Sequence, residues 1–147
     1  MTGLPKCVVD ASVGIKLFVD EELSEVAELL FAEPVTSREA CRYVPDLFFI
    51  ECANVLWKYV LRYSYPPEDA RRNLSLLYDL SLDTIAATTL ISEALNIALA
   101  HSISVYDACY VATADLVEAP LVTADERLVK RLEGTKHQVC FLGSLIS

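Results

Sequence analysis

Long apolar runs and paired cysteines are missing from this sequence of 147 residues. The longest apolar stretches are broken by charged side chains such as Asp46, Glu51 and Glu93, so none reaches the roughly 18 uninterrupted residues that a membrane-spanning helix needs. The five cysteines form no CxxC pair, which argues against zinc and thioredoxin-like chemistry. Near the first residue, Asp10 interrupts the apolar stretch and no basic cluster precedes it. We therefore expect no secretion signal and a cytoplasmic protein.

Basic charge is also scarce, with 12 Lys and Arg against 21 Asp and Glu and a net charge of −9. Such a chain repels nucleic acid in bulk, so a polyanionic substrate would need a bound metal or a local basic strip. The acidic surface suits a basic protein partner. Because 54% of the residues are apolar, we also expect a hydrophobic surface for a homodimer or a partner.

Short apolar strands alternate with helical segments along the chain. We predict strands within residues 6–9, 42–47, 82–87, 121–123 and 138–143. Helices are expected from residue 11 to about 19, from a Ser24 cap, around Glu51, from Pro66–Pro67, over 90–102 and 105–118, and from 126 to a stop at Gly134. Residues 34–43 are less regular. No linker or repeat interrupts the pattern, which predicts one α/β domain over 1–147 with a mostly parallel sheet covered on both faces.

Four acidic residues occupy informative positions. Asp10 and Asp125 follow predicted strands, where ligands bind in open α/β sheets, while Glu51 and Asp107 lie in apolar helices. If the strands before Asp10 and Asp125 are neighbours, all four acids can converge on one pocket. Four ionised carboxylates would repel one another there, and a hard divalent cation such as Mg²⁺ resolves the conflict.

Each acid also has a structural interpretation. Asp10, Asp107 and Asp125 could be helix caps, because Asp is common at that position. Glu51 stands beside the apolar stripe of its helix, where a buried charge is costly unless a metal ion, Lys or Arg faces it.

Four short blocks carry a resemblance to a known family: "VVDAS" at 8–12, "ECANVLW" at 51–57, "SVYDACYVATA" at 104–114 and "LVTADERL" at 121–128. In this order they resemble the PIN-domain metal-dependent ribonucleases, in particular the VapC-type toxins. The resemblance implies a three-layer α/β/α fold with a five-stranded parallel sheet of order 3-2-1-4-5. It also implies Mg²⁺- or Mn²⁺-dependent cutting of single-stranded RNA that leaves a 3′-hydroxyl and a 5′-phosphate.

The residue roles follow from the same resemblance. Asp10, Glu51, Asp107 and Asp125 match the family's catalytic and metal-binding acids. The matching supporting residues are Ser12, Asn54 and Thr123. The VapC-like context further implies a VapB-like antitoxin, whose basic side chain would enter the acidic pocket, and a homodimer.

Substrate contacts are predicted from helical geometry instead. At 100° per residue, Lys58 and Arg62 each lie within about 20° of Glu51 on one helix face. This arrangement favours a basic track that leads RNA phosphates to the acids, although Lys58 and Arg62 could equally be solvated surface residues. Arg127, with Lys130 and Arg131, could form a second strip.

Three other functions compete with this one. A catalytically silent PIN-like binding or regulatory subunit would keep the fold without turnover. A phosphatase or receiver domain also places acids at strand ends, but this chain has Ser12 where such phosphatases carry a second Asp. A 5′-nuclease acting on branched DNA normally needs further helices, for which 147 residues leave no room.

Overall fold

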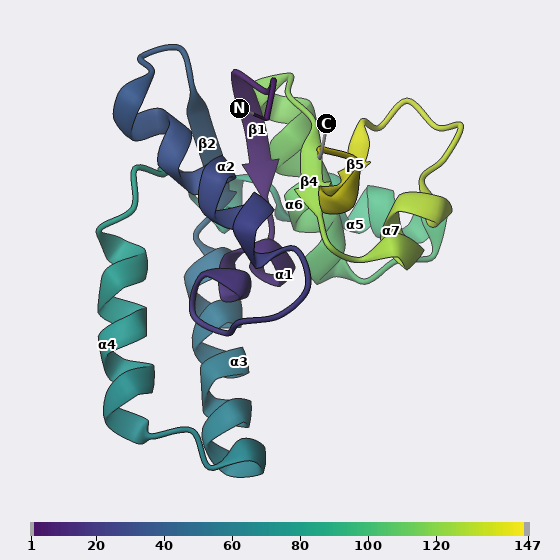
Figure 1. Cartoon of the computed structure of the whole chain (residues 1–147). Coiled ribbons are helices and arrows are strands. Elements are labelled where there is room, and N and C mark those ends of the chain that lie inside the picture. Colours follow the sequence, from purple (N-terminus) through teal and green to yellow (C-terminus); the bar gives the residue numbers. More distant parts are fainter. Residues whose placement is uncertain (1, 146–147) are drawn as a thin grey trace.

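The computed structural model describes residues 2–145 and contains one parallel five-stranded sheet (Figure 1). The strands are β1 (Lys6–Val9), β2 (Cys41–Pro45), β3 (Asp83–Ile85), β4 (Leu121–Thr123) and β5 (Val139–Phe141). Their order is β3-β2-β1-β4-β5, and every neighbouring pair is parallel. The predicted sheet and strand order are confirmed. Since β1 and β4 are neighbours, the acids that follow them lie at the same edge.

Helices cover the sheet and extend beyond it. They are α1 (Ala11–Gly14), α2 (Ser24–Thr36), α3 (Leu47–Tyr63), α4 (Pro67–Tyr78), α5 (Ile91–His101), α6 (Val105–Val117) and α7 (Glu126–Arg131). Short 3₁₀ turns occur at Ile15–Leu17, Ala87–Thr89 and Leu142–Leu145. In Figure 1, α2 lies in front of the sheet and α5 and α6 lie behind it. Helices α3 and α4 run side by side and extend away from the sheet as a hairpin.

Helix α6 forms the centre of the core. Every residue from Ala108 to Ala114 is buried, and the helix contacts β1, β2 and β4 on one side and α5 on the other. The buried stretch of β1, Cys7–Val9, packs into the same core. This burial explains why the segment "ACYVATA" carries no charge, and it fixes the helix that holds Asp107 firmly against the sheet.

Helix α1, which follows β1, packs closely against α3. A Cβ atom added at Gly14 would lie 2.6 Å from the ring of Phe48, which is fully buried in α3. The absence of a side chain at Gly14 therefore lets α1 pack directly against α3. The same contact sets the spacing between Asp10, just before α1, and Glu51 in α3.

Local structure differs from the sequence expectation in four places. One is α7, which ends at Arg131 and not at Gly134. The helix expected up to residue 19 is one α-turn followed by a 3₁₀ turn that ends at Leu17. Ser24 begins α2 but does not cap it, because its hydroxyl accepts from the Glu21 amide and donates to the Val19 carbonyl. Helix α2 continues through Pro34 to Thr36, into the stretch expected to be irregular. Among residues 2–145, no helix is long and apolar enough to cross a membrane.

Candidate active site

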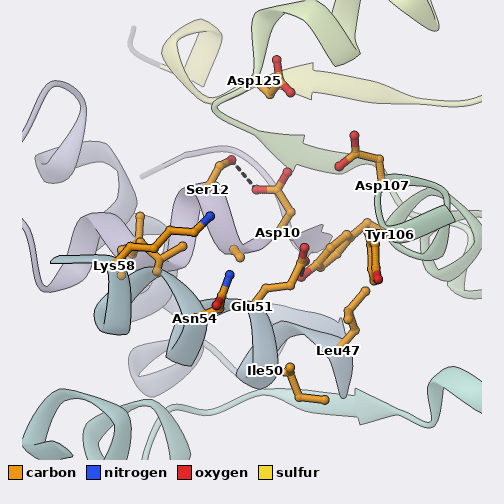
Figure 2. Close-up of a pocket in the computed structure, with 14 residues that line it drawn as sticks. Asp10, Ser12, Leu47, Ile50, Glu51, Asn54, Lys58, Tyr106, Asp107 and Asp125 are labelled. Carbon is orange, nitrogen blue, oxygen red and sulfur yellow. Dashed lines mark hydrogen bonds between the residues drawn. The ribbon is translucent and has the colours of Figure 1, made fainter. Parts of the chain in front are cut away.

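The four predicted acids line one cavity of about 600 Å³ at the carboxyl edge of the sheet (Figure 2). Asp10 follows β1 and Asp125 lies two residues after β4, while Glu51 and Asp107 project from α3 and α6. The sequence predicted that the four acids meet if the strands before Asp10 and Asp125 are neighbours, and β1 and β4 are neighbours.

Asp10 is the most buried of the four acids, with 6% of its surface exposed. The Ser12 hydroxyl donates to Asp10 Oδ1 at 2.5 Å, and the Val13 amide donates to the same oxygen at 3.3 Å. Burial, partly offset by these hydrogen bonds, raises the pKa of Asp10 to about 6. The carboxyl group is therefore held in one orientation in surroundings that disfavour its charge.

A hydroxyl network connects the ends of β1 and β4. Ser12 Oγ accepts from the Ala124 amide at 3.0 Å and lies 3.3 Å from Thr123 Oγ1, which in turn accepts from the Asp125 amide at 3.1 Å. Ser12 and Thr123 thus fix Asp10 and the chain before Asp125 relative to one another. These are the contacts expected of residues that support an acidic site.

Two of the acids are both helix caps and pocket residues. Asp10 is the N-cap of α1, and Asp125 is the N-cap of α7, where its Oδ1 accepts from the Arg127 amide at 2.9 Å. Asp107 is not a cap, because Ser104 occupies that position in α6. The pKa of Asp107 is raised by burial first and by the nearby charge of Asp125 second. Capping and function are therefore compatible at this edge.

Glu51 contacts a phenol, and neither a Lys nor an Arg faces it among residues 2–145. The Tyr110 hydroxyl donates to Glu51 Oε1 at 2.6 Å, and no ion pair to Glu51 occurs within residues 2–145. Burial raises the pKa of Glu51, the Tyr110 hydrogen bond opposes that rise, and the charge of Asp107 adds to it. Glu51 is also half-buried and points into the cavity from the border of its apolar stripe.

Tyr110 is a site residue that sequence reasoning missed. It lies three residues after Asp107 on α6, so both side chains leave the same helix face, but its apolar neighbours made it look like a core residue. Its ring is buried and its hydroxyl orients Glu51. A tyrosine one turn from a functional acid was the available signal.

We predict that Tyr110→Phe lowers any metal-dependent activity of the site, or its Mn²⁺ affinity, by about 10-fold, because loss of a partner that orients a metal ligand has costs of this size. Calorimetric Mn²⁺ titration and thermal melting would measure affinity and fold separately. Tyr106→Phe is the matched control, since Tyr106 lines the same cavity and its hydroxyl makes no hydrogen bond within the described residues. Equal affinities for wild type and both variants would show that Tyr110 only packs.

The residues predicted to support the acids or to bind substrate do not all line the same cavity. Asn54 and Lys58 line the cavity from α3, and the Lys58 side chain points toward it in Figure 2. Arg62, one turn further along α3, does not line it. Arg127 lines a second cavity that shares Asp107 and Asp125. The exposed side chains of Ile50 and Tyr106 form an apolar border of the first cavity together with Leu47.

The donor set fits a hard divalent cation. None of the four acids has an ion-pair partner within the described part of the chain, so their charges are compensated only by neutral donors. Within residues 2–145, however, no three Asp, Glu, His or Cys side chains are gathered closely enough to form a complete metal site. Oxygen ligands around an open cavity suit Mg²⁺ or Mn²⁺, because such ions keep several waters and bind partly through them.

A parallel sheet of order 3-2-1-4-5, with acids at its carboxyl edge that form no ion pair among residues 2–145, defines an α/β protein with an acidic pocket. The family model for the PIN domain matches residues 7–133. The chain therefore belongs to the PIN-domain family. It is 34% identical over 128 residues to Ribonuclease VapC3 of Pyrobaculum aerophilum, covering 86% of this chain and 94% of that protein.

Solved structures share the fold. The crystal structure of PAE2754 from Pyrobaculum aerophilum superposes with a TM-score of 0.70 at 24% identity, covering 95% of this chain and 85% of that one. A toxin–antitoxin complex from Klebsiella pneumoniae gives a TM-score of 0.65 at 18% identity, covering 92% of this chain and 97% of that one. At these identities the likeness concerns the fold.

Proposed function

We propose that this protein is a Mg²⁺- or Mn²⁺-dependent endoribonuclease that hydrolyses phosphodiester bonds of single-stranded RNA, and that it is the toxin of a toxin–antitoxin pair. The observation that carries the proposal is the gathering of Asp10, Glu51, Asp107 and Asp125 around one open cavity without an ion-pair partner in the described chain. The name of the relative from Pyrobaculum aerophilum, Ribonuclease VapC3, supports the choice of a ribonuclease.

The four acids would hold the metal directly or through water, and a bound metal supplies an activated water and neutralises charge on the phosphate. The chain's own groups set the geometry. Ser12 and the Val13 amide hold Asp10 Oδ1 in place, and Tyr110 holds Glu51 Oε1. Glu51 would either bind the metal or orient the attacking water.

The border of the cavity supports a single-stranded substrate. Tyr106 is 63% exposed and Ile50 is 68% exposed beside the acids, so an unstacked base can lie against them while its phosphate faces the carboxylates. A base held in a duplex cannot do so. Lys58, which has no ion-pair partner in the described chain, supplies a positive charge on the α3 side. We assign Lys58 and, further along α3, Arg62 to the approach of the RNA backbone.

The antitoxin is proposed from the relatives and from surface chemistry. Two of the solved structures with this fold are described as a toxin–antitoxin complex and as VapBC2 from Rickettsia felis bound to a promoter DNA fragment. The chain has a net charge of −9, and large apolar side chains, among them Trp57 and Leu61, are exposed on α3. A basic, amphipathic partner and a homodimer would cover such surfaces. Purification from native cells as a solitary monomer would contradict both assignments.

The test of the nuclease is cleavage of a labelled single-stranded RNA pool by purified protein in Mn²⁺, Mg²⁺ or EDTA, with the same sequences annealed as duplex for comparison. We expect cutting of the single strand in either metal, none in EDTA, and products that end in a 3′-hydroxyl and a 5′-phosphate. Cutting that persists in EDTA would contradict the metal requirement. Mn²⁺ binding by calorimetry without cleavage of any RNA would favour the silent binding subunit.

A further inference from the structure

The acidic site opens on two sides. Asp107 and Asp125 line the cavity of about 600 Å³ and also a second cavity of about 240 Å³. The second cavity lies between the end of α5 and α7, and its remaining lining residues are Ser102, Ile103, Ser104, Arg127, Leu128 and Arg131. The two cavities therefore meet at a wall that consists of proposed metal ligands.

Two arginines line the second cavity beside the two aspartates, although the whole chain has a net charge of −9. Arg127 and Arg131 are exposed and stand four residues apart on α7, so their guanidinium groups share one helix face. Neither forms an ion pair within residues 2–145, although two aspartates line the same cavity. The other exposed arginine pair behaves differently, since Arg71 and Arg72 each bind an acid of their own helix.

The backbone links these arginines to the acidic site in a fixed register. Asp125 Oδ1 accepts from the Arg127 amide at 2.9 Å, so the helix that carries both arginines begins at a proposed metal ligand. The second cavity has a volume of about 240 Å³. A phosphodiester with its sugar can enter a space of this size, and two guanidinium groups match a phosphate well.

We propose that the cavity lined by Arg127 and Arg131 binds the backbone phosphate adjacent to the scissile one. The RNA strand then crosses the acids from the Lys58 side of α3 to the arginine side of α7. This inference rests on the proposed nuclease function and adds Arg131, with Arg127, as the contact that places the strand. The pair binds and orients substrate and takes no part in bond breaking.

The test compares wild type with Arg127→Gln/Arg131→Gln and with Lys6→Gln/Lys136→Gln. The lysine variant removes the same charge at two exposed positions and leaves both acid-lined cavities intact. The probe is a fluorescein-labelled random single-stranded RNA, followed by anisotropy in Ca²⁺ and by cleavage in Mn²⁺. We expect the arginine variant to bind about 10- to 100-fold more weakly, the range for charge-assisted hydrogen bonds to one group.

Salt dependence gives a second readout. Loss of one phosphate contact to a single strand makes the slope of log K against log salt less negative by about 0.7, and we expect this change in the arginine variant. The lysine variant should keep the wild-type slope. RNA binding that is equal in the two double variants would overturn the subsite while leaving the nuclease intact. A wild type that neither binds nor cuts RNA would overturn the proposed function, and the subsite with it.

The contacted phosphate can be located in an RNA that wild type cuts at one mapped bond. Replacing single phosphates by uncharged methylphosphonates should weaken wild type strongly at one position next to the cut. The arginine variant should be insensitive at that position, because the charge is already without a partner. An equal loss in both proteins at every position would contradict the assignment.

Discussion

Asp10→Asn should abolish RNA cleavage, lowering kcat by at least about 10³-fold, which corresponds to about 4 kcal/mol of transition-state stabilisation. Asp10 is the most buried acid of the cavity, and its carboxylate is held by Ser12 and the Val13 amide toward the other acids. Asn keeps an oxygen that can accept both hydrogen bonds but removes the charge that a cation requires. Single-turnover cleavage with Mn²⁺ would measure the loss, and Asp79→Asn, at an exposed position after α4, is the charge-matched control.

The same substitution should not weaken the metal-free fold. Burial raises the pKa of Asp10 from 3.8 to about 6, so the folded state binds the proton more tightly than the unfolded state. The stability contributed by Asp10 is then present below about pH 4 and is lost as the pH rises through about 6. In EDTA at pH 7.5, Asp10→Asn should melt at or above the temperature of wild type. A lower melting temperature combined with lost activity would mean that Asp10 supports the fold and not the chemistry.

The strand pattern and the acids were predictable from the sequence because each has a local signal. The β-branched run before Asp10 and the apolar "LVT" before Asp125 indicate strands, and acids directly after strands indicate the carboxyl edge. That β1 and β4 are neighbours follows from no local pattern. It came from the resemblance, and the structure confirms it.

Contacts between segments that are distant in the chain could not be predicted from local sequence patterns. Nothing local shows that the Tyr110 hydroxyl reaches Glu51, 59 positions away, or that a second cavity joins the end of α5 to α7. The sequence suggested a metal ion, a Lys or an Arg beside Glu51 because burial of a charge is costly. Neither a Lys nor an Arg faces it among residues 2–145, and half-burial and the Tyr110 hydroxyl lower the cost of its charge. Helix periodicity likewise grouped Arg62 with Lys58, although only Lys58 lines the cavity.

Arg42 is the largest fully buried side chain and was equally hidden from sequence reasoning, since an Arg in a strand is usually read as exposed. Its Nε donates to the Leu30 carbonyl at 2.7 Å, and Nη2 binds Glu33 Oε2 at 2.6 Å. Its Nη1 donates to three carbonyl oxygens, those of Leu4, Pro5 and Cys41. One guanidinium group therefore ties the chain before β1 to α2 and β2.

Arg42→Leu should destabilise the protein by about 3–5 kcal/mol, the cost of breaking a buried ion pair from one side. The variant leaves the Glu33 carboxylate without its cation and four carbonyl oxygens facing an apolar side chain. For a chain of this length the melting temperature should fall by about 10 °C. Urea unfolding followed by circular dichroism would measure the free energy, and Arg38→Leu, at an exposed loop position, is the control.

Glu33→Gln separates the two parts of this contact. The Gln oxygen can still accept from Arg42 and from the Thr2 hydroxyl, and the four carbonyl bonds of Arg42 stay in place. The Thr2 amide loses its acceptor, because a Gln NH₂ group replaces the second carboxylate oxygen, so we expect a cost of about 1–2 kcal/mol. A loss as large as that of Arg42→Leu would show that the ion pair dominates over the carbonyl bonds. Either variant should keep its cleavage rate per folded molecule, because Arg42 lies near the amino ends of β1 and β2 while the acids lie beyond the carboxyl ends of β1 and β4. A drop in kcat without unfolding would instead show that the contacts of Arg42 at the amino edge of the sheet affect the acids at its carboxyl edge.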